Sequence, residues 1–291
     1  MQSNIRAKTI ILVVSLKGGV GKSTVAASLA NYIAEKGYIT GLWDLDITSP
    51  SIPSILNCQG KKLFVGAGLI QPYKYSENLS VMSVDFLLPK TDQPIVFKGE
   101  EKPYQIRQFL KSVEYPKLDY LVMDTPPTTS EELIAILELF PKRKMHIVFV
   151  TQPSEISENA VKRSICMLKD GGFKIKGILS NMGHAKCPKC TTTFGLFKEG
   201  IGVESVAEEY GIPFLGTIPI NEGFDRKTNL LNGTIFSEIA GNIIENESIQ
   251  FEERLTPKSL ATKARLGIKA LQKIKKENIE AEQMNEGEHD D

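Results

Sequence analysis

The chain has 291 residues, of which 41% are hydrophobic, and its 35 Lys and Arg residues balance its 35 Asp and Glu residues. One large α/β domain can hold this length, and the hydrophobic content suffices for a buried core. The balanced charge gives no indication of a nucleic-acid partner, and no run of about 18 apolar residues indicates a membrane span. The N-terminal residues lack the apolar segment of a signal peptide, and four cysteines do not indicate a disulfide framework, so we expect a cytoplasmic protein.

Strand and helix patterns alternate along the chain as far as residue 248. Apolar runs predict strands over residues 9–15, 39–44, 79–84, 118–123, 146–151, 174–180 and 213–217. Helical spacing of apolar residues predicts helices over 22–36, 103–113, 130–140, 154–170, 201–210 and 234–248. Near-continuous apolar runs are typical of parallel strands covered on both faces. The order therefore predicts a doubly wound, mostly parallel sheet with helices on both faces and ligands at the carboxyl ends of its strands.

A glycine-rich segment, KGGVGKST at residues 17–24, lies between the first predicted strand and the first predicted helix. Glycines let the backbone close around phosphates, and the helix N-terminus adds N–H donors and the positive end of its dipole. The segment therefore predicts a nucleotide site, in which Lys22 reaches the β- and γ-phosphates and the Ser23 hydroxyl binds Mg²⁺. The remaining predicted nucleotide contacts are Gly18, Gly19, Val20, Gly21 and Thr24.

This loop departs from the ordinary phosphate-binding pattern at two adjacent positions. Leu16 stands where glycine is usual, and an extra lysine, Lys17, follows it. The loop resembles the deviant Walker A loop of the MinD/ParA/nitrogenase-iron-protein class of dimeric ATPases. The resemblance implies that Lys17 reaches the nucleotide of a partner subunit and that hydrolysis requires a face-to-face dimer.

Three carboxylates and an amide stand at or just beyond strand ends. A carboxylate in such a place can orient the water that attacks the γ-phosphate, and the resemblance gives this role to Asp46. It puts Asp44 near Mg²⁺ or its water shell, with a loop-capping carboxylate as the alternative for both residues. Asp124 ends an apolar strand, where a carboxylate that holds Mg²⁺ through water belongs. Asn181 ends a later strand, and the resemblance implies that it reads the adenine edge; an ordinary turn asparagine is the alternative.

A CPKC motif comes after that strand and supplies Cys187 and Cys190. Two thiolates three residues apart can bind one metal ion or cluster. Cys58 and Cys166 are solitary and are predicted to be small core residues, so four thiolates at one site would come from two subunits. A redox disulfide and a contribution from His184 are the alternatives that the motif leaves open.

Taken in order over residues 8–248, these motifs resemble the Mrp/ApbC family of iron–sulfur cluster carrier ATPases, which includes eukaryotic cytosolic scaffold ATPases. The resemblance implies a homodimer that binds and slowly hydrolyses ATP. It also implies a bridging [4Fe–4S] cluster on Cys187 and Cys190 that is passed to apo iron–sulfur proteins. The chain departs from the family pattern at residues 97–100, at residues 128–130 and in its C-terminal tail.

We expect residues 1–250 to form the ATPase domain and residues 251–291 to form a separate segment. Residues 256–276 contain seven basic residues and no acid, and residues 277–291 contain seven acids and no Lys or Arg. Apolar residues at helical spacing predict that 256–276 is a basic amphipathic helix. Packing of this helix on the domain is one interpretation, and contact with a membrane surface or a partner is the other.

Two other functions share part of this pattern. A zinc-clamped dimeric targeting ATPase would use the same cysteines, because a Cys₄ tetrahedron suits zinc and iron–sulfur equally. That function needs a Met-rich groove for its client, however, and the seven methionines are scattered along the chain. A MinD/ParA-like positioning ATPase would use the basic helix but has no use for CPKC. The cysteines therefore favour the cluster carrier.

Overall fold

The computed structural model describes residues 5–15, 17–47, 49–66, 69–87, 102–127, 131–187, 189–190, 192–197, 202–220, 224–225 and 227–252. The predictions about Leu16, about residues 97–100 and 128–130, and about the C-terminal tail beyond residue 252 lie outside these described residues.

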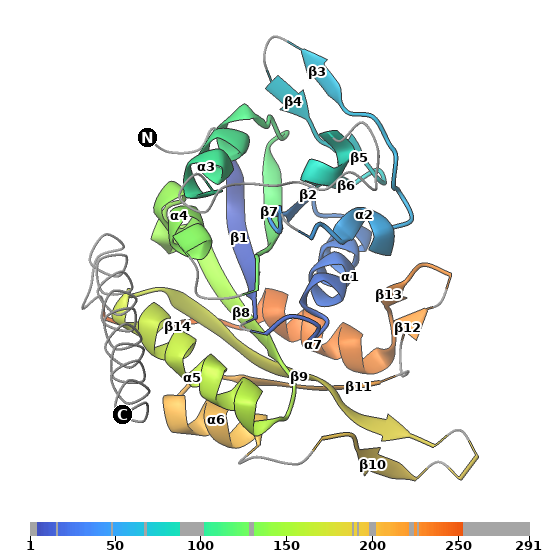
Figure 1. The fold of residues 1–291 in the computed structure, drawn as a ribbon, viewed down its shortest axis with the longest axis vertical. Helices are drawn as coiled ribbons and strands as arrows, with labels where there is room; N and C mark the ends of the chain where they lie inside the picture. The colour runs from blue at the N-terminus through green and yellow to red at the C-terminus, as the bar shows by residue number, and fades with distance from the viewer. Residues whose placement is uncertain are drawn as a thin grey trace, which may run out of the picture.

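One ten-stranded sheet forms the middle layer of the molecule (Figure 1). Its strands are β1 (Ala7–Val14), β2 (Thr40–Asp44), β5 (Tyr73–Lys74), β6 (Leu79–Met82), β7 (Leu118–Asp124), β8 (Met145–Thr151), β9 (Lys174–Lys186), β10 (Thr193–Gly195), β11 (Phe214–Ile220) and β14 (Ile249–Gln250). The order is β10-β9-β8-β1-β7-β2-β6-β5, and β11 and β14 also pair with β9. The central pairings and that of β9 with β11 are parallel, whereas β5, β10 and β14 pair antiparallel to their neighbours.

Helices cover both faces of this sheet (Figure 1). They are α1 (Lys22–Glu35), α2 (Ile52–Ile55), α3 (Lys102–Ser112), α4 (Glu131–Leu139), α5 (Glu155–Asp170), α6 (Val203–Tyr210) and α7 (Thr234–Glu245), with 3₁₀ turns at η1 (Val84–Leu87) and η3 (Lys142–Lys144). Two small ribbons lie outside the main sheet, one of β3 (Phe64–Gly66) with β4 (Leu69–Gln71), the other of β12 (Phe224–Asp225) with β13 (Leu230–Leu231).

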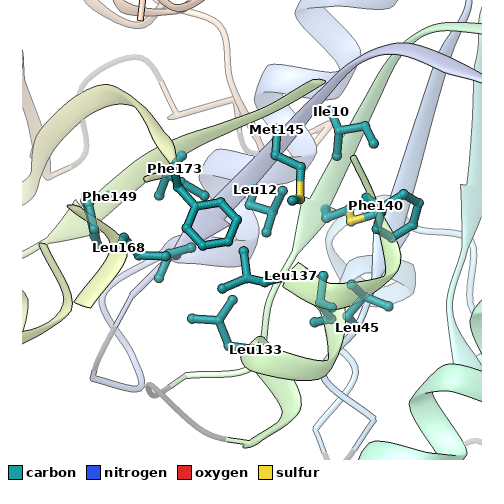
Figure 2. Packing of buried hydrophobic residues seen from close by; sticks show 14 of the residues in the cluster. Ile10, Leu12, Leu45, Leu133, Leu137, Phe140, Met145, Phe149, Leu168 and Phe173 are labelled. Atoms are coloured by element: carbon teal, nitrogen blue, oxygen red, sulfur yellow. The ribbon is translucent and has the colours of Figure 1, made fainter. Parts of the chain in front are cut away.

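Two hydrophobic cores result from the alternation of side chains along the strands. On β1, Ile10, Leu12 and Val14 belong to the core shared with α4, α5 and α6, which Figure 2 shows in part. Ile11 and Val13 belong to the other core, shared with α1 and α7. Because both faces of the central strands are buried, their sequences are continuous apolar runs rather than alternating ones.

The predicted fold class is confirmed, and every predicted strand and helix is present. The short elements α2, β3, β4, β5, β10, β12, β13 and β14 were not predicted. Among the predicted elements the largest difference concerns β9, for which the sequence predicts an end at residue 180 but which continues to Lys186. Beyond residue 180 this strand pairs with β11 and, as a hairpin, with β10, so its extent depends on pairing rather than on an apolar run. α7 ends at Glu245 rather than at residue 248, because the chain then turns to pair β14 with β9. None of the helices that the structure describes combines the length and the apolar composition of a membrane span.

Candidate nucleotide and metal sites

The glycine-rich loop connects β1 to α1, as the sequence predicts. Gly19 and Gly21 adopt φ angles of 79° and 83°, in the left-handed region that glycine enters without a Cβ penalty. A Cβ on Gly21 would also overlap the side-chain amide of Asn181. α1 begins at Lys22 without a side-chain cap, so its first N–H groups remain available to an anion. The loop and the helix start therefore have the geometry of a phosphate site.

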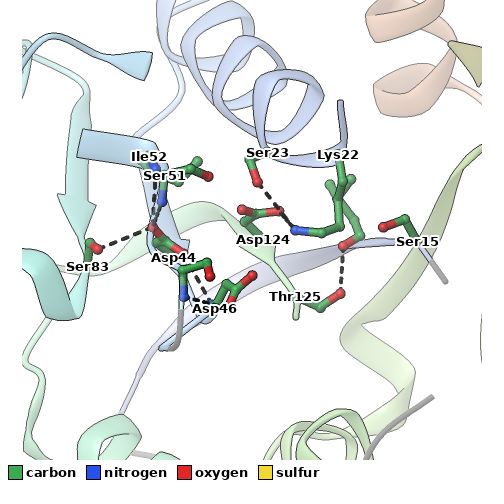
Figure 3. A network of polar contacts seen from close by, with 12 residues as sticks. Ser15, Lys22, Ser23, Asp44, Asp46, Ser51, Ile52, Ser83, Asp124 and Thr125 are labelled. Atoms are coloured by element: carbon green, nitrogen blue, oxygen red, sulfur yellow. Dashed lines mark hydrogen bonds and ion pairs between the residues drawn. The ribbon is translucent and has the colours of Figure 1, made fainter. Parts of the chain in front are cut away.

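A buried ion pair joins this loop to the end of β7. The Lys22 ammonium donates to Oδ1 of Asp124 and also lies 3.4 Å from Ser23 Oγ (Figure 3). The other oxygen of Asp124, Oδ2, is buried and has no hydrogen-bond partner among the described residues. Burial raises the pKa of this carboxyl despite the lysine beside it.

These residues fit a nucleotide with Mg²⁺. A hydroxyl and a carboxylate are oxygen ligands of the kind that Mg²⁺ and its waters accept, and the orphaned Oδ2 of Asp124 could accept a hydrogen bond from such a water. Ser23 and Asp124 would hold the metal, and Lys22 would hold the phosphates.

Asp44 organises the loop after β2. Its Oδ2 accepts hydrogen bonds from the backbone N–H groups of Ser51 (3.0 Å) and Ile52 (3.2 Å) and from the Ser83 hydroxyl (3.2 Å). Its Oδ1 accepts from the N–H of Asp46 at 3.2 Å (Figure 3). These contacts agree with the loop-capping interpretation of Asp44. The bond to Oδ1 also holds the backbone of Asp46 next to Asp44, where the loop after β2 begins.

Three carboxylates converge where β2 and β7 end side by side. Asp44 and Asp124 are register partners on these strands, and the negative charge of Asp46 acts on both. Burial raises the pKa of Asp44 to about 8, and the Asp124 charge adds to the shift. Asp46 accepts a hydrogen bond from the N–H of Ser49 at 3.1 Å and lies next to this cluster (Figure 3). Lys17 is exposed at the loop surface, and its carbonyl accepts from the Ser15 hydroxyl.

A pocket of about 220 Å³ opens beside the loop. It is lined by Gly21, Thr24, Asn181, Met182, Pro219, Ile220, Phe224 and Leu231. Asn181 Nδ2 donates to the carbonyl of Val20 at 2.8 Å, which ties β9 to the loop. Asn181 therefore lies in the wall of the pocket beside the glycine-rich loop, and its role in reading the base stays a prediction. The sequence did not predict the other lining residues, because they come from separate strands that only the fold brings together; these are Met182, Pro219, Ile220, Phe224 and Leu231.

The two cysteines of the CPKC motif lie at the tip of the β9–β10 hairpin. The N–H of Cys187 donates to the Thr192 carbonyl at 2.9 Å, which closes the turn. Cys190 Sγ lies 3.3 Å from Thr192 Oγ1, and Cys190 is exposed. The Thr192 hydroxyl and N–H, together with Cys187, lower the pKa of Cys190 from 9.0 to about 7. Since the thiolate is the metal ligand, the hairpin favours the reactive form of this sulfur.

No group of three or more His, Cys, Asp and Glu within the described ranges is placed to hold a metal ion. Within those ranges, neither His184 nor another such residue joins the cysteine pair in a group of three. Cys58 is buried, as predicted. The prediction that Cys166 is a core residue is wrong, because it is exposed on the outer side of α5.

Known proteins resemble this chain in sequence and in fold. The family described as ParA, NUBPL iron-transfer P-loop NTPase, matches residues 6–250. The Drosophila melanogaster protein named cytosolic Fe-S cluster assembly factor Nubp2 homolog is 39% identical over 235 residues, which are 80% of this chain and 88% of the relative. A nucleotide-binding protein from Archaeoglobus fulgidus, solved in complex with ADP, is 31% identical with a TM-score of 0.62, over 83% of this chain and 89% of that one. The cell division ATPase MinD of Pyrococcus furiosus shares the fold at 18% identity, with a TM-score of 0.55 over 82% of this chain and 99% of its own.

Proposed function

The chain belongs to the NUBPL iron-transfer P-loop NTPase family, and we propose that it is an ATP-dependent carrier of iron–sulfur clusters. Two copies would hold one [4Fe–4S] cluster as cargo between them and pass it to apo iron–sulfur proteins. The observation that carries this proposal is the hairpin tip, where two cysteines that could make half of a ligand set follow the strand that also lines the pocket beside the glycine-rich loop. The curated relatives carry the word cytosolic in their names, and we place this protein in the same compartment.

On the nucleotide side, each residue would have one role. The amides of residues 18–24 would donate to the phosphates, and Lys22 would exchange its Asp124 partner for the β- and γ-phosphates. Bound Mg²⁺ would neutralise developing phosphate charge, held by Ser23 and, through water, by Asp124. Asp46 would orient the attacking water, and Lys17, which is exposed, would reach the nucleotide of the partner subunit. Thr24 and Asn181 would contact the nucleoside end.

On the cluster side, Cys187 and Cys190 of both subunits would supply four thiolates. A pKa of about 7 keeps a large fraction of Cys190 ionised at neutral pH, which is the state that binds iron. Phe194 and Leu196 come later on the same hairpin, with 49% and 41% of their surfaces exposed. Exposed apolar side chains beside a half-site suit a contact between subunits, and we assign them to the dimer interface.

Two other functions are the alternatives to the carrier. A zinc-clamped targeting ATPase would use the same four thiolates for a structural metal. A MinD/ParA-like positioning ATPase would use residues 256–276, which we assign, with the rest of 251–291, to a segment separate from the ATPase domain of residues 1–250. The relatives' names support the carrier over both.

The test is anaerobic reconstitution of the full chain with iron and sulfide, followed by measurement of metal content, visible absorption and subunit mass. We expect about four irons per dimer and a broad visible absorption. The Cys187→Ser/Cys190→Ser variant should lose both, whereas Cys166→Ser, which removes another exposed cysteine, should keep them. About one tightly bound zinc per dimer without a stable cluster would favour the targeting function. Metal binding that is independent of Cys187 and Cys190 would contradict the carrier and leave the positioning function.

A further inference from the structure

One strand, β9, contributes to both candidate sites. Asn181 and Met182 on this strand line the pocket beside the phosphate loop. Cys187 comes directly after the last residue of the same strand. Figure 1 shows β9 continuing past the parallel sheet into its hairpin with β10. The nucleotide pocket and the thiolates are therefore joined by six residues of one strand.

This strand is irregular at the wall of the pocket. Asn181 pairs with Ile218 of β11, but the next pairing joins Ala185 to Ile220, so β9 advances four residues while β11 advances two. The extra residues form a bulge, a feature that bends a strand and redirects the residues beyond it. Past the bulge β9 pairs with β10 and leads to the cysteines.

Met182 begins the bulge in an unfavourable backbone conformation. Its φ is 57°, which costs a non-glycine residue roughly 1–2 kcal/mol and persists only where the surroundings impose it. Those surroundings are the phosphate loop and the pocket itself. Asn181 bonds to the Val20 carbonyl, and Met182 Cε would lie 3.6 Å from a Cβ on Gly21.

We propose that Met182 is a positioning residue that transmits nucleotide occupancy within one chain to Cys187 and Cys190. A nucleoside entering the pocket would contact the Met182 side chain and alter the contacts that impose its φ. The bulge would then change its bend and move the hairpin tip. This inference rests on the proposed function in that it requires a nucleotide in this pocket, but it requires neither a cluster nor a second subunit.

The test measures the iodoacetamide alkylation rate of each cysteine in the metal-free full chain by peptide mapping, with and without ATP–Mg²⁺. Nucleotide affinity is measured by calorimetry in the same buffer. We expect nucleotide to change the rates at Cys187 and Cys190 by about fivefold or more, the usual size of coupling between two sites. Cys166, exposed on α5, serves as the internal control whose rate should not change.

Two substitutions test whether Met182 carries the coupling. One removes both its backbone strain and its side chain, and the other keeps both. Met182→Gly adopts a positive φ without cost and has no side chain in the pocket, so the nucleotide-dependent change should be largely lost. Met182→Leu keeps an apolar side chain and the same backbone cost, so it should retain the change. Equal responses in the glycine variant and the wild type would overturn the role of Met182.

The remaining outcomes distinguish this inference from the proposed function. A response that grows with protein concentration would come from subunit contact and would overturn the intrachain route. Bound nucleotide with unchanged alkylation in the wild type would overturn the coupling but leave the carrier proposal standing. Failure to bind nucleotide would contradict the proposed function and the coupling together.

Discussion

Replacement of Gly21 by alanine tests whether Asn181 and the phosphate loop are packed against each other as described. Gly19 provides a matched control, because its φ of 79° is close to the 83° of Gly21, while a Cβ there meets no atom within 4 Å. Both substitutions impose the same backbone cost. Only the Cβ at Gly21 overlaps the Asn181 amide and displaces it from the Val20 carbonyl.

The expected magnitudes come from these contacts. Alanine in the left-handed region costs roughly 1–2 kcal/mol, which is the whole effect expected for Gly19→Ala. Gly21→Ala adds the loss of a buried hydrogen bond, about 1–3 kcal/mol when a buried group is left unsatisfied. We therefore expect Gly21→Ala to lower the free energy of unfolding by about 2–5 kcal/mol in total.

Urea unfolding measures these changes, with the fluorescence of Trp43 as the probe. Trp43 is the only tryptophan, is fully buried and packs against the rings of Phe109 and Tyr115. In an Asn181→Ala background the overlap is absent, so Gly21→Ala should cost no more than the backbone term. Equal losses for the Gly19 and Gly21 variants in the wild-type background would refute the reasoning.

Charges at the nucleotide site and on the hairpin give three further expected outcomes. Lys22→Ala leaves Asp124 buried without a cation and should lower the free energy of unfolding by about 3–5 kcal/mol in urea; adding Asp124→Asn should recover most of it, and no recovery would contradict the ion pair. Thr192→Val removes the first cause of the lowered Cys190 pKa, so the midpoint of its alkylation should rise from about pH 7 toward 9.0; an unmoved midpoint would count against this cause. Folding raises the pKa of Asp44 from 3.8 to about 8. Between these pH values the folded state keeps a proton that the unfolded state has lost, so this carboxyl makes the free energy of unfolding fall as the pH rises. Across this pH range, urea unfolding should show that the free energy of unfolding falls less in Asp44→Asn than in the wild type. An equal fall in both proteins would exclude Asp44 as its source.

The sheet was predictable because its central strands are buried on both faces and therefore read as apolar runs. The hairpin was not, because His184 and Lys186 interrupt any such run and the strand there is defined by its pairing with β10. The exposure of Cys166 was also unpredictable from its type. Which face of a helix is exposed depends on the elements that pack against its other face. On α5 the residues next to Cys166 that are buried are Ser164 and Ile165.

Local chemistry and distant contacts explain which site residues could be predicted. The phosphate loop and Asp124 are recognisable from short motifs, because strand, turn and helix start are determined by adjacent residues. Asp44 lies in a similar motif, but its donors come from Ser51 and Ser83, residues that reach it only through the fold. The sequence therefore leaves two interpretations of Asp44, and the position of those donors in the structure supports its role as an organiser of the loop.

The relation between the two sites is visible only when sequence spacing and strand geometry are combined. From Asn181 to Cys187 the chain advances six residues, which in an extended strand span at most about 20 Å. The bulge at Met182 shortens this path and bends the strand before the hairpin, because β9 advances four residues there while β11 advances two. A change of backbone conformation at one residue in the pocket wall would thus be carried to both thiolates, since no flexible linker separates Met182 from the paired strands of the hairpin.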